Sequence, residues 1–294
     1  MTQSQQNIES TSSILIRLLR WDKPAGRLIL MIPALWAVFL AGNGMPPLPL
    51  VGVIIFGSIV TSAAGCVIND LWDRDIDSQV ARTKNRPLAA KALSVKVGII
   101  VAFLAMGCAA ILAFYLNTFT FLLCVAAVPV IVCYPLAKRV FPIPQLVLSI
   151  AWGFAVLISW SAVTTSLTIE TWLLWGATVL WTLGFDTVYA MSDREDDRKI
   201  GVNSSALFFG DYAADAVGIF FALTAIILGY LALRIPLNLI FWLSWTIALI
   251  GWIRQYLQLK QPEIPQATYG KIFGENVNLG FIILIGMIIG CLKF

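Results

Sequence analysis

The sequence predicts an all-α, polytopic membrane protein, and three observations support this fold class. Of its 294 residues, 59% are hydrophobic and only 12% are charged, about half the charged fraction of a soluble domain. The apolar residues are gathered in stretches of about twenty, the length of a membrane-spanning helix, and they lack the alternation of barrel strands. The segments between the stretches are charged or rich in proline and glycine, as in Gly42-Asn-Gly-Met-Pro-Pro-Leu-Pro49, which is typical of helix boundaries.

Nine apolar stretches are the expected transmembrane helices, of which the first and the last are short. Pro33 and Pro129 lie inside two of them, where proline is expected to kink a helix. The stretches are 27–42, 48–69, 95–113, 118–137, 145–164, 170–191, 213–233, 236–257 and 276–293.

The N-terminal segment, residues 1–20, is polar and then amphipathic. Met1 to Ser13 has no basic region leading into an apolar core, so we expect no cleavable targeting peptide. The segment Ile14-Leu-Ile-Arg-Leu-Leu-Arg20 fits either a short helix on the membrane interface or a simple flank of the first span.

The distribution of basic residues predicts the orientation. If the spans alternate from a cytoplasmic N-terminus, every lysine and arginine except Arg234 and Lys293 falls on the cytoplasmic side. Such an asymmetry follows the positive-inside rule. An odd number of spans then places the C-terminus on the opposite side.

Composition also excludes several kinds of site. The net charge of +4 does not indicate a nucleic-acid partner, because the basic residues lie beside the apolar stretches. The five cysteines are isolated, and no CxxC pair exists, which argues against a thiolate metal site or a disulfide framework. The chain has no histidine, which excludes an imidazole base and His-ligated haem or zinc.

Two acidic pentads contain the candidate catalytic and metal-binding residues, which are Asp73, Asp77, Asp193 and Asp197. Asp73-Arg-Asp-Ile-Asp77 recurs as Asp193-Arg-Glu-Asp-Asp197. Residues three or four apart share one face of a helix, so Asn69 extends the first row, and Asp186 and Tyr189 extend the second. Oxygen ligands without a soft partner favour Mg²⁺.

Basic residues follow both acidic rows and also occur in the loop between them. Their positions are Arg82, Lys84 and Arg86 in the first loop, Lys138 and Arg139 after Tyr134 in the second, and Arg198 and Lys199 in the third. Acids that bind a divalent cation, together with bases that bind phosphate oxygens, indicate a diphosphate site. For Arg86 and Lys199, a role as solvated surface cations is an equal alternative.

The duplication decides between a functional and an ordinary interpretation of the pentads. A single DxxxD is usually a solvated helix end, whereas two copies in the same order favour function and suggest two related helix bundles. In a membrane, a diphosphate site suits a polyprenyl diphosphate. Mg²⁺ would neutralise the departing diphosphate, and a cavity within lipid would protect the resulting allylic cation from water.

These residues resemble a known family. The motifs Asn69-Asp-x-x-Asp73-x-x-x-Asp77 and Asp193-x-x-x-Asp197 resemble the aspartate motifs of the UbiA-type intramembrane aromatic prenyltransferases, and Tyr134-Pro-Leu-Ala-Lys138 resembles their YxxxK motif. Four further segments are similar to 4-hydroxybenzoate polyprenyltransferases of ubiquinone or plastoquinone biosynthesis. They are Asp22-Lys-Pro-Ala-Gly26, Arg82-Thr-Lys-Asn-Arg-Pro-Leu88, Asp186-Thr-Val-Tyr-Ala190 and Lys199-Ile-Gly201. Ala90-Lys91 stands where that branch usually has Ser-Gly.

The resemblance implies one integral-membrane domain over residues 1–294, with nine helices around a central cavity that is open to lipid and capped by cytoplasmic loops. Asn69, Asp73 and Asp77 would bind one Mg²⁺–diphosphate unit, and Asp193 and Asp197 the other. Lys138 would contact the diphosphate, and Arg139 would bind the carboxylate of 4-hydroxybenzoate. The prenyl group would go to the ring carbon ortho to the hydroxyl. The expected partners are polyprenyl diphosphate, 4-hydroxybenzoate and the lipid bilayer, without nucleic acid or an obligate protein.

Two alternatives stay open. The acceptor could be homogentisate, a naphthoate, or a chlorophyll or haem precursor. A cation transporter or channel would also use acids within a membrane, although transport sites usually lie near the midplane, and here the middles of the spans are nearly free of charge.

Overall fold

A computed structural model describes residues 9–23 and 25–293. The polar stretch 1–8 lies outside the described residues. Helices make up the regular structure of the described part, which contains no strand. In chain order they are α1 (Thr11–Leu18), α2 (Ala25–Ala41), α3 (Leu48–Asp77), α4 (Val95–Ala113), α5 (Thr118–Cys133), the 3-10 turn η1 (Tyr134–Leu136), α6 (Ala137–Val140), α7 (Pro144–Thr164), α8 (Ile169–Ile200), α9 (Ser205–Phe209), the 3-10 turn η2 (Gly210–Tyr212), α10 (Ala213–Arg234), α11 (Leu239–Leu259) and α12 (Gln266–Gly290).

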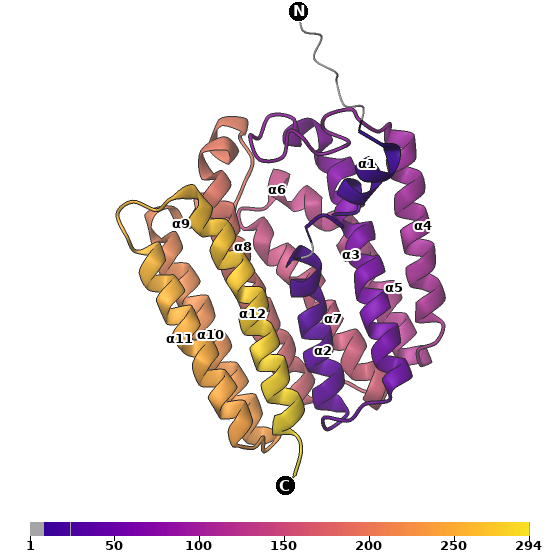
Figure 1. The fold of residues 1–294 in the computed structure, drawn as a ribbon, viewed down its shortest axis with the longest axis vertical. Helices are drawn as coiled ribbons and strands as arrows, with labels where there is room; N and C mark the ends of the chain where they lie inside the picture. Colours follow the sequence, from indigo (N-terminus) through magenta and orange to yellow (C-terminus); the bar gives the residue numbers. More distant parts are fainter. Residues whose placement is uncertain (1–8, 24, 294) are drawn as a thin grey trace, which may run out of the picture.

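The long helices run side by side, and the short helices α1, α6 and α9 lie toward one end of the bundle (Figure 1). The described chain finishes at the opposite end. Six helical segments in the described part are long and apolar enough to cross a membrane, namely Leu48–Asp77, Val95–Ala113, Thr118–Val140, Pro144–Thr164, Ser205–Arg234 and Gln266–Gly290. The all-helical, polytopic prediction is therefore supported.

Three boundaries differ from the predicted stretches. Helix α3 continues to Asp77 and α8 to Ile200, beyond the apolar residues, so both acidic pentads lie on helices, as their four-residue spacing predicts. Helix α12 begins at Gln266, ten residues before the predicted start at 276. Hydropathy marks where a helix leaves the apolar region, whereas backbone hydrogen bonds continue until a cap such as Gly201, which is left-handed with φ +77°.

A break between α5 and α6 was not predicted. The stretch expected over 118–137 ends as an α-helix at Cys133, and Tyr134–Leu136 forms a 3-10 turn. Pro135 lacks an N–H, so regular helical hydrogen bonding is interrupted there. The turn places Tyr134 and Lys138 at the end of the bundle where α3 and α8 carry their acids.

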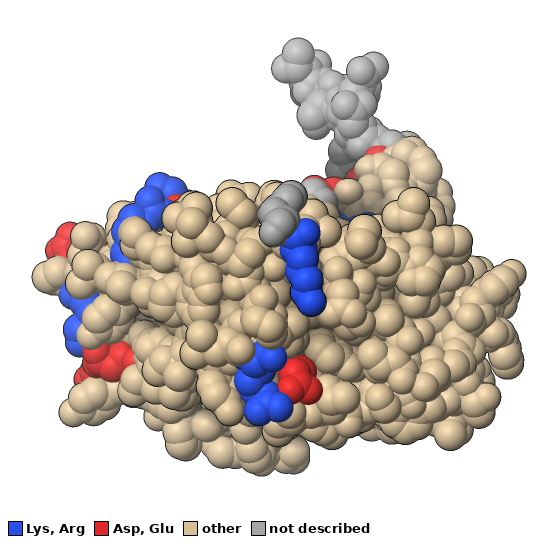
Figure 2. Space-filling view, turned by 90° about the horizontal axis from the view of Figure 1, so that it is seen from below, with Lys and Arg blue, Asp and Glu red and all other residues tan. Residues whose placement is uncertain are grey.

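The main core lies between α2, α7, α8, α10, α11 and α12. Trp36 stacks on Trp181 with ring centroids 4.9 Å apart, and the Asn276 side chain accepts hydrogen bonds from the indoles of Trp181 and Trp252. A smaller cluster includes Leu18 of α1 and Val67 of α3. Figure 2 shows the end away from α1, where Lys, Arg, Asp and Glu side chains are few.

Candidate active site

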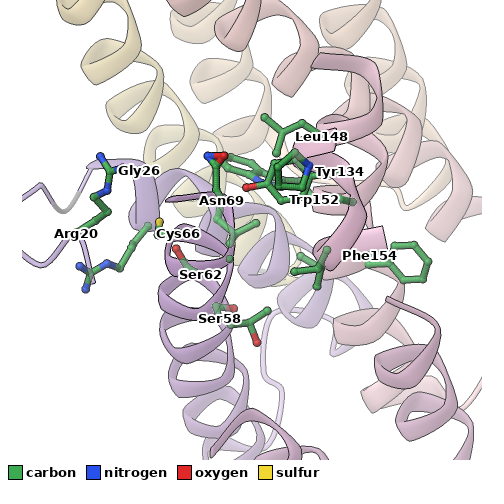
Figure 3. Close-up of a pocket in the computed structure, with 18 of the residues that line it drawn as sticks. Arg20, Gly26, Ser58, Ser62, Cys66, Asn69, Tyr134, Leu148, Trp152 and Phe154 are labelled. Carbon is green, nitrogen blue, oxygen red and sulfur yellow. The ribbon is translucent and has the colours of Figure 1, made fainter. Parts of the chain in front are cut away.

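A cavity of about 940 Å³ lies among α2, α3, α4, α5, α7, α8 and α12. Its lining is charged at one end and apolar at the other, where Leu112, Leu116 and Phe121 contribute. Figure 3 shows Ser58, Ser62 and Asn69 along one face of α3. The volume falls in the range of small-molecule sites, and the polarity divides it into two chemically different regions.

The first acidic row occupies the cavity-facing side of α3. Asn69, Asp73 and Asp77 all line the cavity, as their four-residue spacing predicts. The carboxylates are buried, with 3% of Asp73 and 4% of Asp77 exposed. Gly57, Thr61 and Gly65 continue the same spacing toward the apolar end, so one helix face connects the acids to the apolar region.

The second acidic row lies on α8. Asp186, Tyr189, Asp193 and Asp197 all line the cavity. Arg82, from the loop between α3 and α4, donates from Nε to both carboxylate oxygens of Asp193 at 3.0 Å and from Nη1 to the Tyr189 hydroxyl at 2.9 Å. This arginine joins the loop after the first row to the second row.

Basic side chains neutralise the first row. Lys138 Nζ lies 2.7 Å from Asp73 Oδ2, and Arg86 Nη1 lies 2.6 Å from Asp77 Oδ2. Buried carboxylates need such partners because an unpaired charge in a low-dielectric site is costly. The predicted phosphate-binding bases therefore contact the predicted metal ligands directly.

The donor set fits a hard divalent cation. All candidate ligands are oxygens, and Oδ1 of Asp73 is buried without a hydrogen-bond donor. Within the described residues, no three Asp, Glu, Cys or His side chains are gathered closely enough to hold an ion. Because Lys138 already contacts Asp73 and Arg86 already contacts Asp77, a cation would have to displace these bases from the carboxylates.

Burial also affects Asp197, which lies beyond the apolar stretch 170–191. Burial raises the pKa of the Asp197 carboxyl to about 6, because it disfavours the charged form. A divalent cation would favour the ionised form.

Ten of the twelve predicted site residues line the cavity, and two do not. Arg139 donates to the Trp72 carbonyl oxygen at 2.7 Å and lies 3.5 Å from Asp73 Oδ1. Lys199 is mostly exposed and lies 4.0 Å from Asp196. The ten that line the cavity are Asn69, Asp73, Asp77, Arg86, Tyr134, Lys138, Asp186, Tyr189, Asp193 and Asp197.

The cavity also contains polar residues that the sequence did not single out. Arg20 and Arg27 reach it from the segment around the start of α2, Gln145 from the start of α7, and Asn203 from the connection between α8 and α9. Arg82 lies in the basic stretch that is predicted to bind phosphate oxygens, but the sequence does not single it out there. The four-residue spacing between Arg82 and Arg86 is the sequence feature that could have indicated a role for Arg82. No local feature of the sequence indicates Arg20, which only the fold brings to the cavity.

Comparison with known proteins gives consistent results. A model described as "UbiA prenyltransferase family" matches residues 30–277. The chain is 69% identical over 278 residues to a 4-hydroxybenzoate solanesyltransferase from Synechocystis sp., covering 95% of both proteins. It is 41% identical over 270 residues to a 4-hydroxybenzoate octaprenyltransferase from Neisseria meningitidis, covering 92% of this chain and 90% of that one.

Solved structures share the fold. The apo structure of a UbiA homolog from Aeropyrum pernix K1 aligns with a TM-score of 0.79 at 25% identity, covering 90% of this chain and 98% of that one. A UbiA homolog from Archaeoglobus fulgidus bound to GPP and Mg²⁺ aligns with a TM-score of 0.67 at 21% identity, covering 92% and 99%.

Proposed function

Because the chain belongs to the UbiA prenyltransferase family, we propose that it transfers a polyprenyl group from polyprenyl diphosphate to 4-hydroxybenzoate. The new bond forms at the ring carbon ortho to the hydroxyl. The supporting observation is a single cavity in which two acidic rows and several bases adjoin an apolar region. This arrangement suits a substrate with a diphosphate head and a hydrocarbon tail.

The proposal includes a membrane arrangement that places the charged end of the cavity at an aqueous surface. Nine helices span the bilayer, and the charged end of the bundle, with α1, α6 and α9, faces the cytoplasm. The basic residues gathered at that end support this orientation, and the C-terminus lies on the other side. The diphosphate head group of the substrate then lies near the cytoplasmic aqueous phase, and its prenyl tail lies at the depth of the lipid.

The charged end binds the diphosphate. Asp73 and Asp77 with Asn69, and Asp193 with Asp197, would hold Mg²⁺, which neutralises the negative charge of the departing diphosphate. Lys138, Arg86 and Arg82 contact these carboxylates through ion pairs. When the carboxylates bind cations instead, these three bases are free to bind phosphate oxygens. Metal and diphosphate therefore bind cooperatively.

The transfer requires one bond to break and another to form. The allylic C–O bond is cleaved, diphosphate leaves, the prenyl carbon bonds to the ring carbon, and the ring proton is lost to restore aromaticity. The apolar wall keeps water from the allylic cation. Arg139 binds the acceptor carboxylate after releasing the Trp72 carbonyl, to which it now donates.

Acceptor choice is tested with membranes that contain the protein, Mg²⁺ and a polyprenyl diphosphate. 4-Hydroxybenzoate, homogentisate and 1,4-dihydroxy-2-naphthoate are supplied together, and products are identified by mass spectrometry. We expect prenylated 4-hydroxybenzoate as the dominant product. A dominant product from either of the other acceptors would reject the proposed substrate while retaining prenyl transfer.

A further inference from the structure

Asp70 is a buried carboxylate that neither acidic row uses. It lies on α3 next to Asn69 and is 1% exposed, but it is not among the residues that line the cavity. Its Oδ1 accepts a hydrogen bond from Arg20 Nη2 at 2.7 Å and lies 3.2 Å from Arg86 Nη1. One carboxylate therefore binds two guanidinium groups, and both arginines line the cavity.

The two arginines come from segments far apart in the chain. Arg20 follows α1 and has a left-handed backbone with φ +57°, while Arg86 belongs to the loop between α3 and α4. Leu18, fully buried, packs in one cluster with Val67 and Leu88. Asp70 thus ties both segments to α3 at one point.

The arginines retain unused hydrogen-bonding capacity. Nε of Arg20 and Nε of Arg86 are buried and have no hydrogen-bond partner. Unsatisfied buried donors are rare and costly unless they serve a ligand. Together, Arg20 and Arg86 carry two positive charges against the single negative charge of Asp70. Asp77 supplies a second negative charge only while it is paired with Arg86.

We propose that Asp70 is a positioning residue that holds Arg20 and Arg86 against the cavity wall to receive anionic oxygens of a substrate. It is not a metal ligand, although it lies beside the metal-binding row. The anion is the diphosphate of the donor or the carboxylate of the acceptor, which share this chemistry. The proposal rests on the proposed function, because the anion belongs to one of its two substrates.

The test compares three variants on one helix in the prenyl-transfer assay. Asp70→Asn keeps the size of the side chain and removes its charge, so the charge-assisted bonds to both arginines are weakened. We expect the KM of one substrate to rise about tenfold, with kcat changed much less and with the Mg²⁺ concentration for half-maximal rate unchanged. If the KM for the prenyl diphosphate rises, the anion is the diphosphate. If the KM for 4-hydroxybenzoate rises, the anion is the carboxylate of the acceptor.

Two controls make the result specific. Asp73→Asn should lower kcat and raise the Mg²⁺ requirement. Asp75 lies in the same pentad, but its side chain is 86% exposed. Asp75→Asn should therefore leave KM, kcat and the Mg²⁺ requirement unchanged. If Asp70→Asn raises the Mg²⁺ requirement as Asp73→Asn does, Asp70 is a metal ligand and the proposal is wrong.

A second route keeps the test informative if Asp70→Asn does not fold. Arg20→Gln should raise the same KM, and Arg20→Lys should restore part of the affinity, because it keeps the charge but not the planar fork. Unchanged KM values in Arg20→Gln, or in a folded Asp70→Asn, would overturn the proposal. A wild-type protein that forms no product would instead reject the proposed function.

Discussion

Lys138 Nζ lies 2.7 Å from Oδ2 of Asp73, so a predicted diphosphate ligand and a predicted metal ligand neutralise each other. Arg86 pairs with Asp77 in the same way, and Arg82 with Asp193. These pairs stabilise buried carboxylates that would otherwise lack counter-charges. In the proposed function, metal binding to these carboxylates and phosphate binding to these bases would therefore be interdependent.

The two neighbouring bases Lys138 and Arg139 should affect different substrates. Lys138→Ala should raise the KM for the prenyl diphosphate, whereas Arg139→Ala should raise the KM for 4-hydroxybenzoate. Loss of one charge-assisted contact corresponds to about 2 kcal/mol, or roughly thirtyfold in KM. Steady-state kinetics with each substrate varied in turn provides the measurement. If Arg139→Ala leaves both KM values unchanged, this arginine only anchors α6 to the Trp72 carbonyl.

Orientation can be tested by cysteine labelling in a variant that lacks the five native thiols. Ser78 follows α3 and Ser166 follows α7, and both are exposed. In intact cells, an impermeant thiol reagent should label Ser166→Cys but should label Ser78→Cys only after the membrane is opened. The reverse pattern would place the charged end of the cavity outside the cytoplasm.

The glycines on α3 should limit the length of the prenyl chain. A Cβ added at Gly57 or Gly65 would meet no atom within 4 Å, and both line the cavity. With a rise of 1.5 Å per residue, they lie about 24 Å and about 12 Å from Asp73 along the helix. Gly65→Leu should therefore permit only short chains, and Gly57→Leu somewhat longer ones, as measured with a series of prenyl diphosphates.

Gly52→Leu is the matched control for this series. Gly52 lies on the same helix with the same open surroundings, but it does not line the cavity. Leucine favours a helix more than glycine does, so no loss of folding is expected in any of the three. Equal chain preferences in Gly52→Leu and Gly65→Leu would show that the tail does not follow α3.

The requirement for Mg²⁺ should increase in acid. Burial raises the pKa of Asp197 to about 6, so this carboxylate is ionised above that pH and takes up a proton below it. Because a metal ligand must be deprotonated, the Mg²⁺ concentration for half-maximal rate should be steady near pH 8. Below pH 6 it should increase by up to about tenfold per pH unit. A constant Mg²⁺ requirement between pH 8 and pH 5 would exclude Asp197 as a ligand.

The helical part of the fold could be predicted because apolar length and charged ends are properties of local sequence. The rows on α3 and α8 followed from four-residue spacing, and the structure brings both rows to one cavity. The start of α12 was missed because Lys271 and Glu275 interrupt the apolar pattern inside a continuous helix. The break at Tyr134 was missed because apolar residues run through it.

Long-range pairings could not be predicted. Arg20 and Asp70 are fifty residues apart, and Arg82 and Asp193 are 111 apart, so nothing local indicates which acid each arginine meets. The position of Arg139 outside the lining depends on the orientation of the short helix α6. Sequence motifs identify which residues belong to the candidate site, whereas the packing of the helices determines which ion pairs they form.

The central claim is that both acidic rows support one Mg²⁺-dependent prenyl transfer, and product formation tests it most directly. Wild-type protein, Asp73→Ala and Asp193→Ala are supplied with polyprenyl diphosphate and 4-hydroxybenzoate, with saturating Mg²⁺ or with a chelator. We expect product only from the wild type with Mg²⁺, and a loss of at least about a hundredfold in each folded variant. Near-normal activity in either variant at saturating Mg²⁺, or full wild-type activity in the chelator, would contradict the account.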